Sequence, residues 1–313
     1  MDLYAVAGGD GAGKTATALN LTVALREAGQ YAAVLDADLE GNVASLLGVE
    51  FEATLGDAVA GDAGVRAAMV ERELSADALP EGDLADYREA LAVDRTGFRT
   101  GAEAEGTATA EDEPDTDMVP VVGGWRDRAD HLSTDPEALS YALGDLAMAY
   151  DVLVVDTGNG PAAESPIVDG ADGVLAVTTP DPATCDAAEA DATDCARAGA
   201  QVLGAVINRA GETTRVSELT DTVGAKAFGV VPEDARTAAL EPVAFSVPGS
   251  PAASAYGRLA ESLLDWDGTS GLLGPTPANQ RDGPAGSDVA TDGDGSEPDD
   301  EGSSGFFSRL LGG

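Results

Sequence analysis

Short apolar runs alternate with helix-patterned segments through most of the chain. Runs of strand length lie at residues 3–7, 31–35, 119–122, 152–155, 173–177 and 202–207. Helical patterns lie at residues 16–28, 135–149 and 252–266 and around Cys185 and Cys195. Unbroken apolar strands that alternate with helices are typical of parallel sheets covered on both faces. We therefore predict an α/β fold with a mostly parallel, doubly wound sheet flanked by helices.

Other segments have a weaker pattern. Residues 65–91 carry scattered apolar positions and many charges, which indicates one or two surface helices. Residues 101–117 are acidic and rich in Gly, Thr and Ala, and we predict a mobile loop there. Residues 268–304 are rich in Gly, Pro, Ser and Asp. We therefore expect a domain at residues 1–267, a disordered acidic linker at 268–304 and a short tail at 305–313.

A glycine-rich segment joins the first strand to the first helix. Residues 8–15 read GGDGAGKT, with the spacing G-x-x-x-x-G-K-T. Glycines let the backbone N–H groups turn toward an anion, and the helix N-terminus adds the positive end of its dipole. In this P-loop pattern Lys14 reaches the β- and γ-phosphates, and the Thr15 hydroxyl coordinates Mg²⁺. The segment predicts a P-loop nucleotide site.

Polar residues follow several of the predicted strands. Asp36 and Asp38 follow the second strand, Asp156 follows the apolar run 152–155, and Asn208 follows 202–207. Ligands of open α/β sheets bind at the carboxyl ends of the strands, so these side chains are candidates for the site. Asp156 has the Walker B pattern, in which the carboxylate orients a water molecule on Mg²⁺.

The motifs resemble those of one family. Residues 36–42 read DADLEGN and are followed by LLG at 46–48, which resembles the D-x-D-P-Q-G-N…L-G segment of the ParA/MinD family of P-loop ATPases. The resemblance continues, in the order of the family, through Asp156-Thr157, Ile207-Asn208-Arg209, VPED at 231–234 and SPAASAY at 250–256. It covers nearly all of residues 1–267.

The resemblance implies ATP and Mg²⁺ as cofactors, ATPase activity and an ATP-dependent homodimer. Asp38 would position the attacking water and would be catalytic together with Lys14. Thr15, Asp36 and Asp156 would form the metal site. The implied nucleotide-binding residues are Gly9, Asp10, Gly11, Ala12, Gly13, Lys14, Thr15, Ala16, Asn208 and Pro232. Asn208 and Pro232 would contact the adenine; in the alternative reading, Asn208 is a strand-end residue that caps its own loop.

The sequence departs from the family pattern at several positions. Family members carry K-G-G-x-G-K-T, whereas this chain has Gly9 and Asp10 in place of the lysine and the glycine after it. Leu39-Glu40 replaces Pro-Gln, and GNG follows Thr157 where prolines are usual. We expect ATP binding to be retained. The missing lysine would reach across the dimer in the family, so the sequence does not decide whether one chain activates hydrolysis in the other.

Composition narrows the partners. The 313 residues include 57 acids and 17 bases, for a net charge of −40, and Lys14 and Lys226 are the only lysines. Such a surface suits concentrated salt, as in halophiles, and makes direct DNA binding unlikely, because DNA-binding surfaces cluster Lys and Arg. The N-terminus lacks a signal-peptide pattern and no apolar stretch is long enough to span a bilayer, so we predict a cytoplasmic protein.

The tail adds a second functional indication. In a helix, Phe306, Phe307, Leu310 and Leu311 would form one apolar face, similar to the membrane-targeting tail of MinD-type members. We expect peripheral association with a membrane surface. Binding of a protein partner, or docking on the chain's own domain, is the alternative.

These features predict a MinD-like ATP-driven switch for the spatial positioning of cellular structures, in cell division or polar assemblies. The alternatives are a ParA-type ATPase for chromosome or plasmid partitioning and a nucleotide-binding regulator with weak hydrolysis.

Overall fold

A computed structural model describes residues 1–74, 114–237 and 240–266 of the chain. They form a sheet in the order β3-β4-β2-β5-β1-β6-β7-β8, and every neighbouring pair is parallel except β3 and β4. The strands are β1 (Asp2–Ala7), β2 (Ala32–Asp36), β3 (Met69–Glu73), β4 (Met118–Gly123), β5 (Val152–Asp156), β6 (Gly173–Thr178), β7 (Val202–Ala210) and β8 (Ala227–Pro232). The predicted fold class is confirmed.

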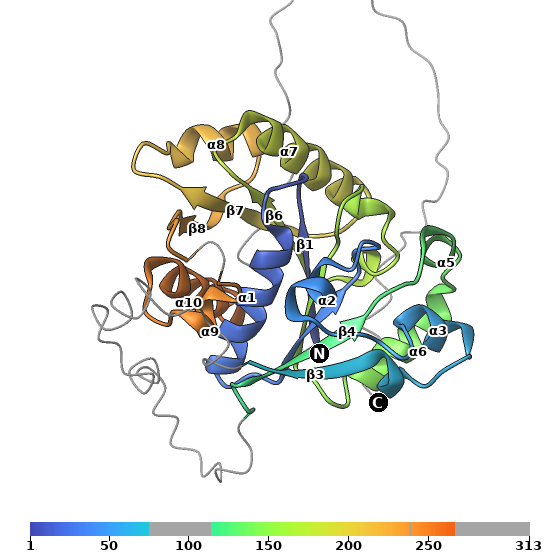
Figure 1. The fold of residues 1–313 in the computed structure, drawn as a ribbon. Helices are drawn as coiled ribbons and strands as arrows, with labels where there is room; N and C mark the ends of the chain where they lie inside the picture. The colour runs from blue at the N-terminus through green and yellow to red at the C-terminus, as the bar shows by residue number, and fades with distance from the viewer. Residues whose placement is uncertain (75–113, 238–239, 267–313) are drawn as a thin grey trace, which may run out of the picture. The chain divides into compact units, whose positions relative to one another are not determined.

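Helices cover both faces of this sheet (Figure 1). The helices are α1 (Lys14–Glu27), α2 (Asn42–Leu47), α3 (Leu55–Ala60), α5 (Arg128–Leu132), α6 (Pro136–Leu146), α7 (Pro182–Arg197), α8 (Val216–Val223), α9 (Val243–Ser246) and α10 (Pro251–Leu264), with 3₁₀ turns η1 (Val65–Ala68), η4 (Ala162–Glu164) and η5 (Val168–Gly170). Tyr4 and Val6 of β1 pack with α1, α9 and α10, whereas Leu3 and Ala5 pack with α3 and α6. On that second face, Ala176 of β6 packs with α7 and α8. Alternate residues of buried strands thus face opposite layers.

Three of the helices begin with a capping side chain followed by proline. Asp135, Asp181 and Ser250 accept hydrogen bonds from backbone N–H groups of α6, α7 and α10, respectively, and each helix has Pro in its first turn. Such a cap satisfies an N–H group that the helix leaves unpaired, and proline has no N–H to satisfy. The predicted start of α6 at Asp135-Pro136 is confirmed.

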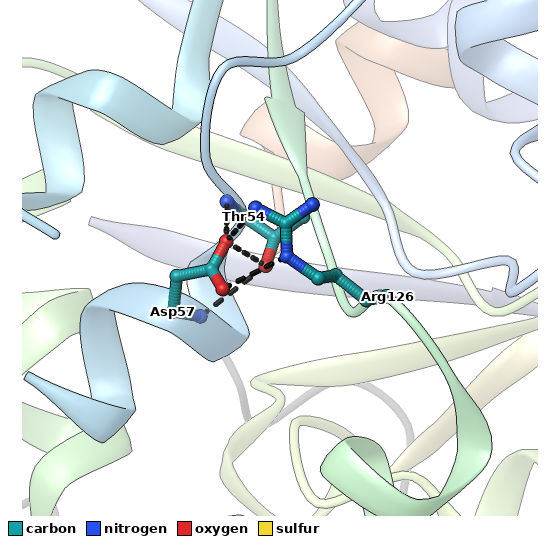
Figure 2. Close-up of polar contacts among 3 residues, drawn as sticks. All are labelled: Thr54, Asp57 and Arg126. Atoms are coloured by element: carbon teal, nitrogen blue, oxygen red, sulfur yellow. Dashed lines mark hydrogen bonds and ion pairs between the residues drawn. The ribbon is translucent and has the colours of Figure 1, made fainter. Parts of the chain in front are cut away.

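A reciprocal cap fixes the start of α3 (Figure 2). Asp57 N–H donates to Oγ1 of Thr54 at 3.2 Å, and Thr54 N–H donates to Oδ2 of Asp57 at 2.7 Å. Arg126, in the loop after β4, donates from Nε to Oδ1 of Asp57 at 2.9 Å. These bonds, the one from Arg126 first, hold the pKa of Asp57 below its usual value. They tie α3 to the loop that follows β4.

The prediction of surface helices at residues 65–91 is wrong for its first part. The 3₁₀ turn Val65–Ala68 leads into β3, which pairs antiparallel with β4. β3 is an edge strand whose last three residues are exposed, so its charges face solvent and its sequence has neither a continuous apolar run nor clear alternation. Strand β8 was not predicted from the sequence. Residues 75–91, most of the predicted mobile loop, the linker and the tail lie outside the described residues.

Candidate functional site

The glycine-rich segment turns from β1 into α1 at the carboxyl edge of the sheet. Gly13 precedes α1 with φ 92°, and a Cβ there would lie 2.3 Å from Nδ2 of Asn208, so only glycine fits. The segment forms one wall of a cleft. The residues that line this cleft are Asp10, Gly11, Gly13, Lys14, Thr15, Asp38, Asn42, Asn159 and Arg209.

Lys14 lies at the base of this cleft and is 5% exposed. Its Nζ donates to the carbonyl oxygen of Gly9 at 3.0 Å and to Oδ1 of Asn159 at 3.2 Å. The ammonium group is therefore held between the glycine-rich loop and the loop that follows β5. A buried cation at this position attracts an anionic ligand.

Asp36 and Asp156 end the neighbouring strands β2 and β5 and are in register with each other. Asp36 Oδ2 accepts the N–H of Ala44 at 2.8 Å, and Asp156 Oδ1 accepts the N–H of Gly158 at 3.3 Å. Within the described part of the chain, the other two carboxylate oxygens, Oδ1 of Asp36 and Oδ2 of Asp156, are buried without a hydrogen-bond partner.

The pKa values of this pair reflect its burial. Desolvation raises the pKa of Asp36 to about 7, although the hydrogen bond from Ala44 favours the charged form. Desolvation also raises the pKa of Asp156, although the nearby Thr15 hydroxyl favours its charged form. Buried carboxylate oxygens are normally hydrogen-bonded, so two unbonded ones on residues that are in register on neighbouring strands suit a hydrated cation. This donor set fits Mg²⁺, whose bound waters would donate to the free oxygens.

Asp38 is fixed at the edge of the cleft and is 5% exposed. The N–H of Glu40 donates to its Oδ1 at 3.0 Å, and the side-chain amide of Asn42 donates to its Oδ2. A Cβ added to Gly158 would lie 2.5 Å from Cγ of Asp38. The two loops that follow β2 and β5 therefore pack directly on each other, with the Asp38 carboxylate beside the Lys14 cleft.

Asn208 is bonded within the protein. Its Nδ2 donates to the carbonyl oxygen of Ala12 at 3.3 Å, and its Oδ1 accepts the N–H of Arg209 at 2.9 Å. The bond from the N–H of Arg209 agrees with the alternative reading, in which Asn208 caps its own loop. Pro232 ends β8 in register with Ala210 and does not line the cleft. The role of both residues at the adenine stays a prediction.

Comparison with known proteins decides the family. Residues 3–242 match the CobQ/CobB/MinD/ParA nucleotide binding domain. The chain belongs to this CobQ/CobB/MinD/ParA family.

Individual members of the family resemble the chain over most of its length. An uncharacterised ATP-binding protein of Methanocaldococcus jannaschii is 29% identical over 267 residues, which are 82% of this chain and 85% of the relative. The structure of the cell division ATPase MinD of Pyrococcus furiosus has a TM-score of 0.59 and 24% identity, over 84% of this chain and 98% of that one. The septum site-determining protein MinD of Pyrococcus horikoshii, solved with Mg-ADP, has a TM-score of 0.58 and 24% identity, over 84% and 95%.

The departures from the CobQ/CobB/MinD/ParA pattern have structural counterparts. A Cβ added to Gly9 would lie 2.6 Å from Cβ of Ala187, so a lysine there would require α7 to move. Glu40 and Asn159, the replacements in two different loops, contact each other: Asn159 Nδ2 donates to Oε2 of Glu40 at 3.4 Å. Because Asn159 also accepts from Lys14, the changed positions meet at the P-loop lysine of this family member.

Several lining residues entered the sequence analysis only as members of motifs. Asn42, Asn159 and Arg209 line the cleft. Their membership of motifs near the carboxyl ends of β2, β5 and β7 was the signal available in the sequence. Conversely, Gly9, Ala12 and Ala16 were predicted to contact the nucleotide but do not line the cleft.

Two further features concern residues 1–74, 114–237 and 240–266. In this part of the family member, no helix is both long and apolar enough to cross a bilayer. It also holds no group of three or more His, Cys, Asp or Glu residues arranged to bind a metal. The metal site expected above therefore rests on a carboxylate pair and a hydroxyl.

Proposed function

We propose that the protein is a MinD-like switch that binds and hydrolyses ATP with Mg²⁺. The observation that carries this proposal is that Lys14 and Asp38 line one cleft with the glycine-rich loop, while Asp156, in register with Asp36, interacts electrostatically with both Lys14 and Asp38. The Mg-ADP complex of the Pyrococcus horikoshii relative supports the choice of cofactor.

Each group in the cleft has a task in this proposal. The N–H groups of residues 9–15 and the Lys14 ammonium bind the phosphates. Thr15 Oγ1 would hold the metal ion, and the free oxygens of Asp36 and Asp156 would accept hydrogen bonds from its waters. Mg²⁺ held by these residues would supply charge neutralisation at the phosphates. Asp38 orients the attacking water, because phosphoryl transfer depends mainly on positioning and electrostatics.

Asp38→Asn should lower the rate of phosphate release from ATP by about 100-fold while ATP affinity changes less than about threefold. The amide retains the size of the carboxylate but cannot accept a proton or two hydrogen bonds in the same way. Steady-state phosphate release and a binding titration measure the two effects. Asp62→Asn, which neutralises an exposed carboxylate outside the cleft lining, is the matched control. An unchanged rate for Asp38→Asn would remove Asp38 from this role.

We further propose that ATP drives formation of a homodimer and peripheral association with a membrane through the tail. Leu39 and Leu46, close to Asp38 in sequence, are 38% and 47% exposed. In this proposal the two leucines contribute apolar area to the contact between the two chains. Two tails on one dimer would bind more tightly than one, because the second binds at a high effective concentration. Such a switch would serve the positioning of cellular structures.

Deletion of residues 306–313 should abolish ATP-dependent sedimentation with liposomes. The apolar side chains of the deleted segment supply the insertion energy, about 1.5–3 kcal/mol each before ordering costs. Purified protein is sedimented with liposomes in high salt, with ATP, ADP or no nucleotide. The double substitution Ser308→Ala and Arg309→Gln, outside the apolar face, is the control. If the full chain does not sediment with liposomes under any of the three nucleotide conditions, the result would instead favour a protein partner for the tail.

A nucleotide-binding regulator with weak hydrolysis is the second candidate. It is favoured by Gly9, where the loop lysine is absent and Ala187 occupies the adjacent space. A ParA-type partitioning ATPase would be supported by DNA binding, which the low content of Lys and Arg disfavours. ATP binding without measurable turnover would support the regulator.

A further inference from the structure

Arg209 lies near the end of β7 and lines the cleft, although it is far along the chain from the glycine-rich loop. It follows Asn208, whose side chain bonds the carbonyl oxygen of Ala12. Arg209 is exposed and lines the same cleft as Lys14. Its place is thus set by a direct link between β7 and the glycine-rich loop.

The backbone of Arg209 is unusual. Its φ is 51°, and it is the sole non-glycine residue with positive φ in the described ranges. The side chain of Asn208 accepts its N–H at 2.9 Å, and the pairing of β7 with β8 shifts between Ile207 and Ala210. A non-glycine residue in the left-handed region is disfavoured and persists where the surroundings hold it, often at functional sites. The end of β7 therefore holds Arg209 in a fixed backbone conformation at the cleft.

Burial raises the pKa values of Glu241 and Tyr256 and the positive charge of Arg209 opposes that rise, but the guanidinium group of Arg209 forms no direct ion pair with either residue. Ion pairs of 2.6–2.9 Å hold five other arginines, namely Arg126, Arg128, Arg197, Arg215 and Arg236. Arg209 forms no ion pair or side-chain hydrogen bond with any residue in the described segments, although the chain has 57 acids. An arginine that has no direct ion pair among the described residues of so acidic a chain is available to bind an anionic ligand.

The composition of the cleft indicates which anion. Lys14 and Arg209 are the two cations among its lining residues, and no aromatic side chain lines it for stacking on a base. Asp10 and Asp38 add negative charge on the same walls, so a bound polyphosphate needs more cationic charge than Lys14 alone supplies. Gly9 cannot supply it, because the position of the family lysine is closed by Ala187.

We propose that Arg209 is a phosphate-binding residue, a second cation beside Lys14 for the polyphosphate of a nucleoside triphosphate. This inference rests on the nucleotide-binding function proposed above. Arg209 contacts the anionic chain and leaves recognition of the base to other residues. Its contribution therefore increases with the number of phosphates on the ligand.

The test compares the affinities of ATP, ADP and adenosine for the full chain and its variants by calorimetric titration at fixed ionic strength. Arg209→Gln should lower the affinity for ATP by about tenfold, because one charge-assisted contact to phosphate is lost. The affinity for ADP should fall by less, and the affinity for adenosine should not change. Arg209→Lys should recover most of the ATP affinity. Arg258→Gln, which removes an exposed charge on α10 away from the cleft lining, should have no effect.

Two results would overturn this assignment while leaving the proposed function intact: unchanged ATP affinity in Arg209→Gln, or equal losses for ATP and adenosine, which would mean contact with the base. Failure of the unsubstituted chain to bind ATP would overturn the proposed function itself. Thermal melting of each variant without nucleotide separates loss of a ligand contact from loss of the fold.

Discussion

Replacing Lys14 by alanine should lower the affinity for ATP by about 100-fold or more, because a charge-assisted phosphate contact inside a cleft is lost. Lys14 is buried and donates to both Gly9 and Asn159, so its ammonium lies between the two loops that would enclose the phosphates. No other lysine can replace it, since the chain has only one more, Lys226. Calorimetric titration with Mg-ATP measures the effect.

Lys226→Ala is the matched control. Lys226 is exposed, and its carbonyl oxygen accepts the N–H of Ala205 at 2.7 Å through backbone alone, so the substitution leaves this contact in place. It removes the same charge from the chain outside the cleft lining. ATP affinity retained by Lys14→Ala would contradict the assignment of the glycine-rich segment as a phosphate site.

Asp156→Asn should make the metal-free protein more stable and bind Mg-ATP much more weakly. Asp156 is fully buried and one of its oxygens is unbonded beside Asp36, so removal of its charge relieves desolvation and repulsion. We expect the free energy of unfolding to rise by about 1–3 kcal/mol in the presence of a chelator. Denaturant titrations measure it. The same change should lower the affinity for Mg-ATP by about tenfold or more, since a carboxylate that would accept hydrogen bonds from the waters on the metal is lost.

Asp62→Asn, at an exposed turn carboxylate, controls for the general loss of one negative charge and should change stability by less than about 0.5 kcal/mol. If Asp156→Asn were less stable than the original chain without Mg²⁺, the carboxylate would have a structural role. Stability and function are often opposed at functional sites. That result would mean that they are not opposed at Asp156.

The sequence predicts the layered fold and the loop chemistry because these signals are local. Buried strands such as β1 and β5 are continuous apolar runs, and the glycine-rich segment contains its own spacing. The edge strand β3 was missed because an exposed strand needs no apolar run. Its pairing with β4 depends on residues far along the chain.

The geometry of the site depends on long-range pairing, which one sequence does not contain. Asp36 and Asp156 become neighbours only because β2 pairs with β5 across the sheet. The closure of Gly9 by Ala187 joins a loop to a distant helix, and the left-handed backbone of Arg209 follows from its link to Ala12 through Asn208. Each of these features arises from packing between distant segments, so local pattern could not predict it.

The most direct measurement is the crystal structure of the protein with Mg²⁺ and a non-hydrolysable ATP analogue. We predict phosphates on the N–H groups of residues 9–15, an ion on the Thr15 hydroxyl, and its waters hydrogen-bonded to the free oxygens of Asp36 and Asp156. A nucleotide bound elsewhere, or an ion that contacts neither carboxylate directly or through water, would contradict the proposed site.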